Sequence, residues 1–169
     1  MSRVLIVIDM QNDFVTGSLG TKEAQDIVPK VVDKVNKALA NGDRIIFTKD
    51  THYEFYMQTL EGEKLPIPHC IKGTEGWEII PQLKEVATEV IEKYTFGSFI
   101  ALPSLVQLAD EIELIGLCTD ICVVSNALIL RAITPNRKIV VDSSCCAGTS
   151  KEAHDSALTV MKMCQIDVK

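Results

Sequence analysis

The stretch that decides the fold runs from residue 114 to residue 128, LIGLCTDICVVSNAL, and joins an apolar strand to an apolar helix. The break between the two falls at Gly116 and at Thr119-Asp120. Cys122 comes at the start of the predicted helix, where backbone N–H groups lack partners and the helix dipole is positive. Such a position stabilises a thiolate. The stretch therefore predicts a nucleophile, although a free cysteine in an apolar run is more commonly an inert core residue.

The composition indicates one globular domain that spans residues 1–169. With 47% hydrophobic and 24% charged residues, the chain can form a full-sized core. The formal net charge is −6, and the 17 Lys and Arg are scattered rather than clustered. A basic surface for nucleic acid or an anionic membrane is therefore not expected. The composition leaves the oligomeric state open, a homo-oligomer included.

The sequence also carries no pattern typical of export. The apolar run near its beginning is too short for a signal peptide and ends in an acid. No run reaches the roughly 18 apolar residues of a membrane span. We therefore expect a cytoplasmic protein. Its six cysteines include no CxxC pair, which predicts individual reduced thiols rather than a zinc knuckle or a disulfide framework.

Alternating apolar runs and helical patterns predict a three-layer α/β/α domain. The expected strands are Val4–Ile8, Ile45–Thr48, Glu89–Glu92, Ile112–Leu117, Lys138–Asp142 and, at an edge, Ile166–Val168. The expected helices are Asp26–Ala40, about Trp77–Lys84, Ala101–Ala109, Ile121–Ile133, and about thirteen residues opened by Ser150. This order favours a doubly wound, mainly parallel six-stranded sheet with right-handed crossovers.

Polar residues follow four of the predicted strands. Asp9 ends the first, Asp50 follows the second, Lys93 ends the third and Cys122 follows the fourth. Because ligands of such sheets bind beyond the carboxyl ends of the strands, we expect these four residues at one edge. An acid, a base and a thiol in one crevice are what acyl transfer requires. The segment 51–77 is longer than most connections, which indicates a functional insertion.

Five short strings add a family resemblance, in the order IDMQNDF (8–14), KDTH (49–52), PHC (68–70), EKYTFGSF (92–99) and GLCTDICV (116–123). Together they resemble the isochorismatase-like cysteine hydrolases and, within them, the nicotinamidases (pyrazinamidases). The resemblance extends from Val4 to about Ala147. It implies the six-stranded fold of that family and hydrolysis of nicotinamide to nicotinate and ammonia through a cysteine thioester. Pyrazinamide is the other small amide that it implies.

The resemblance implies that Asp9, Lys93 and Cys122 form the catalytic triad. Thiol-dependent amide hydrolysis needs an activated sulfur, a proton carrier and donors for the oxyanion. Asp9 would carry the proton, and Lys93 would favour the thiolate and hold Asp9. The expected oxyanion donors are the backbone N–H groups of Cys118 and Cys122, with a cis peptide bond between Leu117 and Cys118. Taken alone, Asp9 could equally cap a turn and Lys93 could be solvated.

A divalent metal ion is the implied cofactor, and the insertion at about 50–77 is its expected binding loop. The resemblance assigns Asp50, His52 and His69 to the ion. Asp50 and His52 lie two residues apart in an extended segment, so both can face one side. Zn²⁺, Mn²⁺ and Fe²⁺ all accept mixed carboxylate and imidazole ligands, and the sequence does not choose among them. In the family the ion orients the pyridine ring and does not activate water.

Further residues of the site follow less directly. Glu61 is the first candidate for a fourth metal ligand, with Glu54 and Glu63 as rivals. Phe14 and Phe96 are the expected plates around a flat ring. Further lining is expected from Leu19, Leu65 and Phe99, while Trp77 anchors the loop and His154 is a surface residue. Cys118 places a second thiol near the nucleophile, so a reversible disulfide with Cys122 is a further hypothesis.

Three other functions compete with this interpretation. Another amidase of the same superfamily could act on a carbamoyl or ureido substrate, but such relatives generally lack the DxH and PH metal residues. A non-catalytic binding subunit is the alternative from a different class, and the complete triad argues against it. A thiol redox protein is a weaker rival, because the chain has no CxxC pair.

Overall fold

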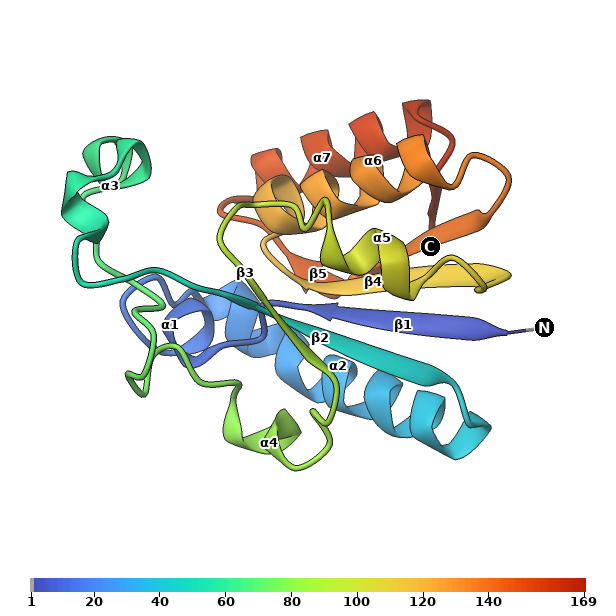
Figure 1. The fold of residues 1–169 in the computed structure, drawn as a ribbon, viewed down its shortest axis with the longest axis horizontal. Helices are drawn as coiled ribbons and strands as arrows, with labels where there is room; N and C mark the ends of the chain where they lie inside the picture. Colours follow the sequence, from blue (N-terminus) through green and yellow to red (C-terminus); the bar gives the residue numbers. More distant parts are fainter. Residues whose placement is uncertain (1) are drawn as a thin grey trace.

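A six-stranded parallel sheet with the order β3-β2-β1-β4-β5-β6 forms the centre of the molecule (Figure 1). The computed structural model describes residues 2–169, apart from the side chain of Pro103. The strands are β1 (Arg3–Ile8), β2 (Arg44–Asp50), β3 (Val90–Lys93), β4 (Glu111–Leu117), β5 (Lys138–Ala147) and β6 (Asp167–Val168). Every ladder between them is parallel. The predicted doubly wound sheet is therefore confirmed, and it is wholly rather than mainly parallel.

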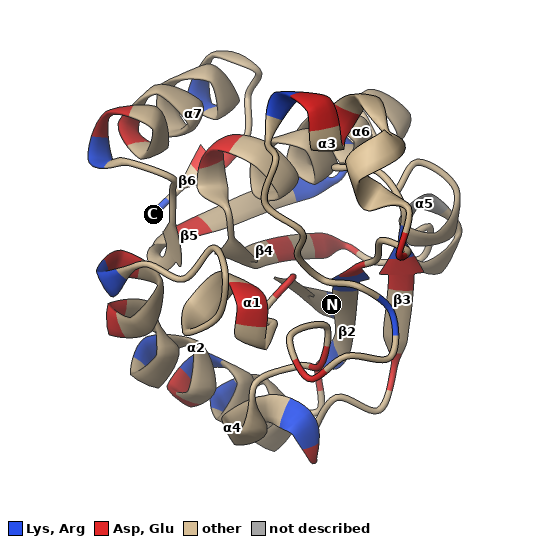
Figure 2. Ribbon diagram, turned by 90° about the vertical axis from the view of Figure 1, so that its left-hand side faces the viewer, with Lys and Arg blue, Asp and Glu red and all other residues tan. Residues whose placement is uncertain are grey.

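Helices cover both faces of the sheet (Figure 1). One face carries α1 (Asn12–Val15), α2 (Lys22–Asn41) and α4 (Pro81–Lys84), and the other carries α5 (Ala101–Leu105), α6 (Val124–Ile133) and α7 (Lys151–Met163). The 3-10 turn η1 (Tyr56–Gln58) and α3 (Leu60–Lys64) project from the insertion between β2 and β3. Within residues 2–169, no helix is long and apolar enough to cross a membrane. Both α2 and α7 carry charges of both signs (Figure 2).

The central strand β1 supplies both hydrophobic cores. Its side chains alternate between the two faces, as the pleat of a strand requires. Val4, Ile6 and Ile8 pack under α5, α6 and α7, whereas Leu5 and Val7 pack under α2 and α4. A continuous apolar run is therefore needed in this strand, which is typical of a parallel sheet covered on both sides.

Helix α2 begins four residues before the predicted start at Asp26. The Thr21 hydroxyl accepts a hydrogen bond from the N–H of Ala24 at 3.0 Å and caps the helix. The earlier start places Pro29 inside the helix rather than in its first turn. The helix ends at Gly42, whose φ of 75° is left-handed, a conformation that glycine adopts without steric cost.

The end of β4 approaches β1 unusually closely. Gly116 has a φ of 115°, and a Cβ there would collide with the carbonyl of Ile8. The pairing of β4 with β5 also shifts register between Leu114 and Gly116, as in a bulge. β5 continues past this shift to Ala147, five residues beyond the predicted end at Asp142. Gly116 thus brings the segment after β4 next to Asp9, which directly follows β1.

Glu113 on β4 is fully buried in a cluster of basic side chains. The ammonium groups of Lys34 and Lys169 lie 2.9 and 2.7 Å from its carboxylate, and Arg3 also pairs with it. Burial alone would raise the pKa of Glu113, but the hydrogen bonds from Lys169 and Lys34 outweigh it and lower the pKa. The carboxylate therefore stays ionised and joins β1, β4, α2 and the C-terminal residue.

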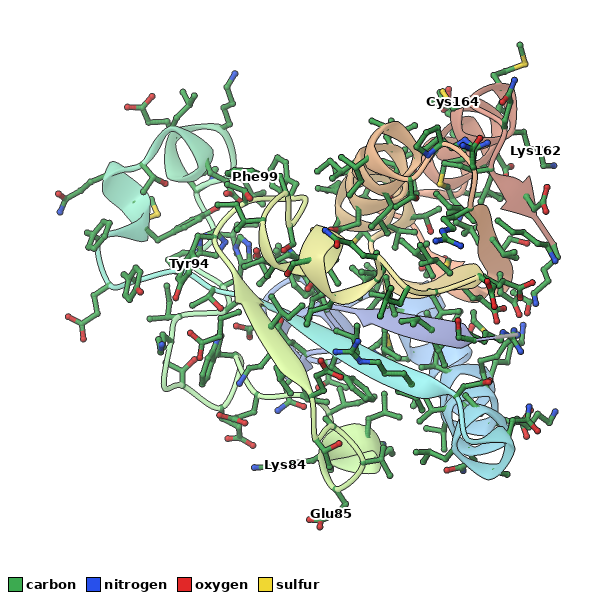
Figure 3. All side chains as sticks on the ribbon, turned by 45° about the vertical axis from the view of Figure 1, so that its right-hand side comes forward. Lys84, Glu85, Tyr94, Phe99, Lys162 and Cys164 are labelled. Carbon is green, nitrogen blue, oxygen red and sulfur yellow. The ribbon has the colours of Figure 1, made fainter. Side chains whose placement is uncertain are left out.

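Replacing Glu113 by glutamine should lower the free energy of unfolding at pH 7 by about 2 kcal/mol, because three partly exposed basic groups lose their buried, charged partner. Since folding lowers this pKa, the ionised group stabilises the protein above its ordinary value of 4.5. The difference between wild type and Glu113→Gln should shrink as the pH falls below that value. Urea unfolding at pH 7, 5 and 3.5 measures it. Glu85→Gln, at an exposed surface position (Figure 3), is the control, and a pH-independent difference at Glu113 would contradict this account.

Candidate active site

The carboxyl ends of the strands bring four buried polar side chains together. Asp9 directly follows β1 with a left-handed φ of 47°, while Asp50 and Lys93 are the last residues of β2 and β3 and are paired in register. Cys122 lies in a π-helical turn (Thr119–Val123) between β4 and α6. All four are at most 4% exposed. The four residues predicted to share one edge of the sheet therefore form a cluster of largely buried side chains.

The Lys93 ammonium is the centre of this cluster. Its Nζ lies 2.7 Å from Asp9 Oδ2 and 3.1 Å from Asp50 Oδ1, and it donates to Cys122 Sγ at 3.3 Å. Asp9 Oδ1 accepts a hydrogen bond from the Thr48 hydroxyl at 2.6 Å. Asp9 Oδ2 pairs with the Lys93 ammonium and has no other polar partner among the described residues. One oxygen of Asp9 is therefore held by a hydroxyl group, and the other by the charge of Lys93.

Burial and charge set the protonation states of the three groups. Burial raises the pKa of Asp9, and the positive charge of Lys93 opposes this. Burial also raises the pKa of the Cys122 thiol well above its usual range, against the effect of Lys93. For Lys93 itself, burial would lower the pKa, but the negative charges of the Asp9 and Asp50 carboxylates outweigh burial and raise it. The lysine is therefore charged and the cysteine is a neutral thiol at rest.

This result corrects the expectation that Cys122 is stabilised as a thiolate at a helix N-terminus. The regular helix begins at Val124, and Cys122 precedes it in the wider π-helical turn. Only 4% of the residue is exposed, so desolvation of a thiolate outweighs the nearby positive charge. Proton transfer from the thiol to a neighbouring base is therefore required before the sulfur can act as a nucleophile.

The segment before Cys122 has the backbone geometry that the family resemblance implies. The peptide bond between Leu117 and Cys118 is cis. The Cys118 carbonyl accepts hydrogen bonds from the N–H groups of Ile121 and Val123 at 3.1 and 3.0 Å, so it is turned into the π-helical turn. Cys118 and Cys122 both line the same cavity. Their role as oxyanion donors stays a prediction.

A cavity of about 850 Å³ opens above Cys122. Its volume lies within the range of small-molecule sites. Four of the five residues expected around a substrate ring line it: Phe14, Leu19, Leu65 and Phe96. Phe99 is 62% exposed (Figure 3) and is not among the lining residues. The indole N–H of Trp77 donates to the Thr51 hydroxyl at 3.0 Å, so this side chain anchors the loop after β2.

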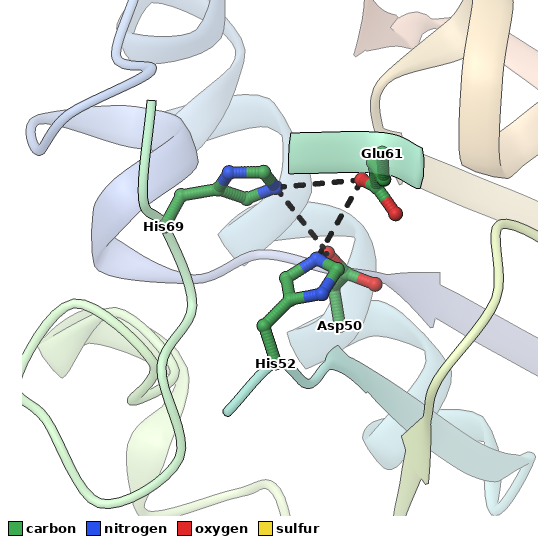
Figure 4. A group of neighbouring side chains, drawn as sticks. All are labelled: Asp50, His52, Glu61 and His69. Carbon is green, nitrogen blue, oxygen red and sulfur yellow. Dashed lines mark hydrogen bonds and ion pairs between the residues drawn. The ribbon is translucent and has the colours of Figure 1, made fainter. Parts of the chain in front are cut away.

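Asp50, His52, Glu61 and His69 form a compact group (Figure 4). All of them except His52 line the cavity. One potential ligand atom from each lies within 4.8 Å of the other three. The His69 Nε2 is 3.7 Å from Asp50 Oδ2 and 3.8 Å from Glu61 Oε1, and the His52 Nε2 is 3.6 Å from Glu61 Oε1. The two rivals of Glu61, Glu54 and Glu63, lie outside this group, and both are exposed.

The chemistry of the group fits a divalent cation. Three of the separations, 3.6–3.8 Å, exceed a hydrogen bond but suit two atoms that each bind one ion at about 2.0–2.2 Å. The His52 Nε2 and Asp50 Oδ2 lie closer, at a hydrogen-bond distance of 2.9 Å. The His69 Nδ1 is hydrogen-bonded to the Ile67 carbonyl at 2.8 Å, which leaves its Nε2 directed at the group. The charges of Lys93 and His52 outweigh burial and lower the pKa of Asp50. An ionised carboxylate and two imidazoles are thus available together.

Several supporting residues were not predicted from the sequence. Gln11 exchanges hydrogen bonds with the backbone of Asp50, donating to its carbonyl at 2.9 Å and accepting from its N–H at 2.7 Å. His154, expected at the surface, has its Nδ1 2.8 Å from the Thr119 hydroxyl, in the turn that carries Cys122. Gln11 lies inside the string IDMQNDF, so its position in that motif could have indicated a role in the site. No sequence motif contains His154.

Comparison with known proteins places the chain among described families. The isochorismatase domain matches residues 3–168. A Bacillus subtilis protein, "Uncharacterized isochorismatase family protein PncA", is 31% identical, and the match covers 94% of this chain and 93% of that protein. The structure of a pyrazinamidase/nicotinamidase from Streptococcus mutans is 32% identical, with a TM-score of 0.85 and coverage of 99% and 100%. The structure of the pyrazinamidase of Pyrococcus horikoshii in complex with zinc is 27% identical, with a TM-score of 0.87 and coverage of 100% and 99%.

Replacing Lys93 by methionine should slow alkylation of Cys122 by iodoacetamide at pH 8 about tenfold or more. The loss of the positive charge raises the pKa of the thiol further, and each pKa unit lowers the thiolate fraction tenfold. Peptide mass spectrometry resolves the rate for each cysteine. Exposed Cys164 serves as the internal reference (Figure 3), and an unchanged ratio of the Cys122 rate to the Cys164 rate would contradict the proposed effect of Lys93.

Proposed function

The chain belongs to the isochorismatase family, and we propose that it hydrolyses nicotinamide to nicotinate and ammonia through a thioester on Cys122. The observation that carries the proposal is the position of Lys93. Its ammonium contacts the acid, the thiol and a carboxylate of the candidate metal group at once. The residues proposed to attack the amide therefore lie next to the residues proposed to orient its ring, at one cavity.

The proposed reaction begins with the amide carbonyl above Cys122. Asp9 Oδ2 takes the thiol proton, and the sulfur attacks the carbonyl carbon to form a tetrahedral oxyanion. The N–H groups of Cys118 and Cys122 stabilise its negative charge. Asp9 then returns the proton to the amine, the C–N bond breaks and ammonia leaves. Water attacks the thioester while Asp9 accepts its proton, and the acid product and the free thiol of Cys122 are released as Asp9 is deprotonated.

We propose that Asp50, His52, Glu61 and His69 hold one divalent ion. When bound, the ion supplies an electrophilic contact for the ring nitrogen of a pyridine. Zn²⁺ is favoured, because a related pyrazinamidase has been solved with zinc and this ligand set suits it. Mn²⁺ and Fe²⁺ accept the same donors. Glu61 comes from α3, so the metal group would also fix the projecting insertion against the sheet.

The cavity wall suits a flat aromatic amide. Phe14 and Phe96 are the proposed plates around the ring, and Leu19 and Leu65 complete an apolar lining. Cys122, Asp50, Glu61 and His69 line the same cavity. A carbamoyl or ureido substrate has no ring nitrogen for a metal to orient, so the group of four ligands favours the pyridine amide over this alternative. Pyrazinamide presents the same ring nitrogen and amide.

The first test is ammonia release from nicotinamide. Cys122→Ala should reduce kcat by at least about 10⁴-fold, because the nucleophile is lost. Asp9→Asn should reduce it about 10²–10⁴-fold through loss of the proton carrier. Cys164→Ala, at an exposed position, should retain the wild-type rate. No detectable ammonia from the metal-loaded wild type would refute the proposed substrate, and near-normal rates in both site variants would refute the proposed triad.

The second test measures metal affinity without using activity. Glu61→Gln should weaken zinc binding about 10–100-fold, because a charged donor is replaced by a weaker neutral one. Competition with a chromophoric chelator gives the dissociation constant. Glu63→Gln changes an exposed glutamate on the same helix and should bind zinc as the wild type does. Equal affinities of the two variants would remove Glu61 from the ligand set.

A further inference from the structure

The segment between β3 and α5 carries the cavity residue Phe96 and lies directly on α6. At Gly97, an added Cβ would collide with the Cδ1 of Ile129 and come within 3.3 Å of Ser125, both on α6. No side chain separates the segment from the helix at this point. The position of the Phe96 backbone therefore depends on how the segment is fastened to α6.

One buried side chain makes that attachment. The Asn126 amide nitrogen donates to the carbonyl of Phe96 at 3.2 Å and to the carbonyl of Cys122 at 2.7 Å. Its amide oxygen accepts the N–H of Ser98 at 2.8 Å. Asn126 is 0% exposed and Ser98 is 7% exposed. Because water has little access, loss of the amide would leave three backbone groups without their partner.

We propose that Asn126 is a positioning residue that sets the distance between the aromatic wall at Phe96 and the nucleophile Cys122. A single planar amide joins the backbone of the two residues, one contributed by the segment after β3 and the other by the turn before α6. Ring binding depends on that spacing, whereas the sulfur is held independently by its own turn and by Lys93. The inference rests on the proposed function, since it assigns Phe96 to the substrate ring.

The role predicts a separation of KM from the reactivity of the thiol. Asn126→Ala should raise the KM for nicotinamide about tenfold, while kcat changes less than about threefold. The rate of Cys122 alkylation by iodoacetamide, which does not use the aromatic wall, should stay within about twofold of wild type. Asn126→Asp keeps the side-chain volume and the acceptor for Ser98 but removes the amide donor. Asn126→Asp should also raise KM, and it keeps the test valid if the alanine variant does not fold.

Thr134→Val is the matched control. The Thr134 hydroxyl donates to the Leu130 carbonyl at 2.6 Å, so it also bonds the carbonyl four residues earlier, at the far end of α6. If Asn126 merely stabilised the helix, the two substitutions would have the same effect on KM. An unchanged KM in folded Asn126→Ala and Asn126→Asp, or an equal rise in Thr134→Val, would overturn the positioning role.

Hydrogen exchange separates this inference from the proposed function. Amides of residues 95–99 should exchange about tenfold faster or more in Asn126→Ala than in wild type, and at the wild-type rate in Thr134→Val. Unchanged exchange at 95–99 would overturn the attachment whatever the substrate is. If exchange rises but wild type does not hydrolyse nicotinamide, the proposed function fails and so does the assignment to a substrate ring, while the attachment of the segment to α6 holds.

Discussion

The buried ammonium of Lys93 is the interaction on which the site depends. Removing such a charge from water costs several kcal/mol, which only close opposite charges and hydrogen bonds can offset. Here Asp9 and Asp50 supply the charges and the Thr95 carbonyl lies 3.3 Å away. Because one cation serves both carboxylates, the residues of the candidate triad and those of the candidate metal group form one electrostatic unit. A change of charge in one group of residues would therefore shift the pKa values of the other group.

The parallel sheet explains why such a unit can be rigid. Asp50 and Lys93 are register partners at the ends of β2 and β3, so their spacing is set by backbone hydrogen bonds rather than by loop conformation. Gln11 clamps the backbone of Asp50 through two hydrogen bonds, and Thr48 fixes one oxygen of Asp9. Side chains that must keep fixed distances are thus held by strand ends and buried polar contacts.

Much of this arrangement was predictable, because it follows from order along the chain. Apolar runs identify the strands, and parallel strands bring residues such as Asp9, Lys93 and Cys122 to one edge. What could not be predicted depends on contacts between distant segments. In the sequence, Glu113 is only a polar residue within an apolar strand. Its role depends on Lys34 and Lys169, which the fold places beside it. Asn126 stands in the opening stretch LIGLCTDICVVSNAL without any local pattern, because its partners Phe96 and Ser98 come from another part of the chain.

The protonation state of Cys122 shows why burial matters as much as residue type. A neutral thiol is a weak nucleophile and a poor target for oxidants, since the thiolate is the reactive species in both cases. Burial raises the pKa of Cys122 well above its usual range and that of neighbouring Cys118 to about 12. Two thiols four residues apart are thus both protonated at rest, which argues against ready formation of a disulfide between them. In the proposed mechanism the sulfur becomes reactive only when Asp9 takes its proton, so the same burial that protects the thiol would make its chemistry depend on the buried acid beside it.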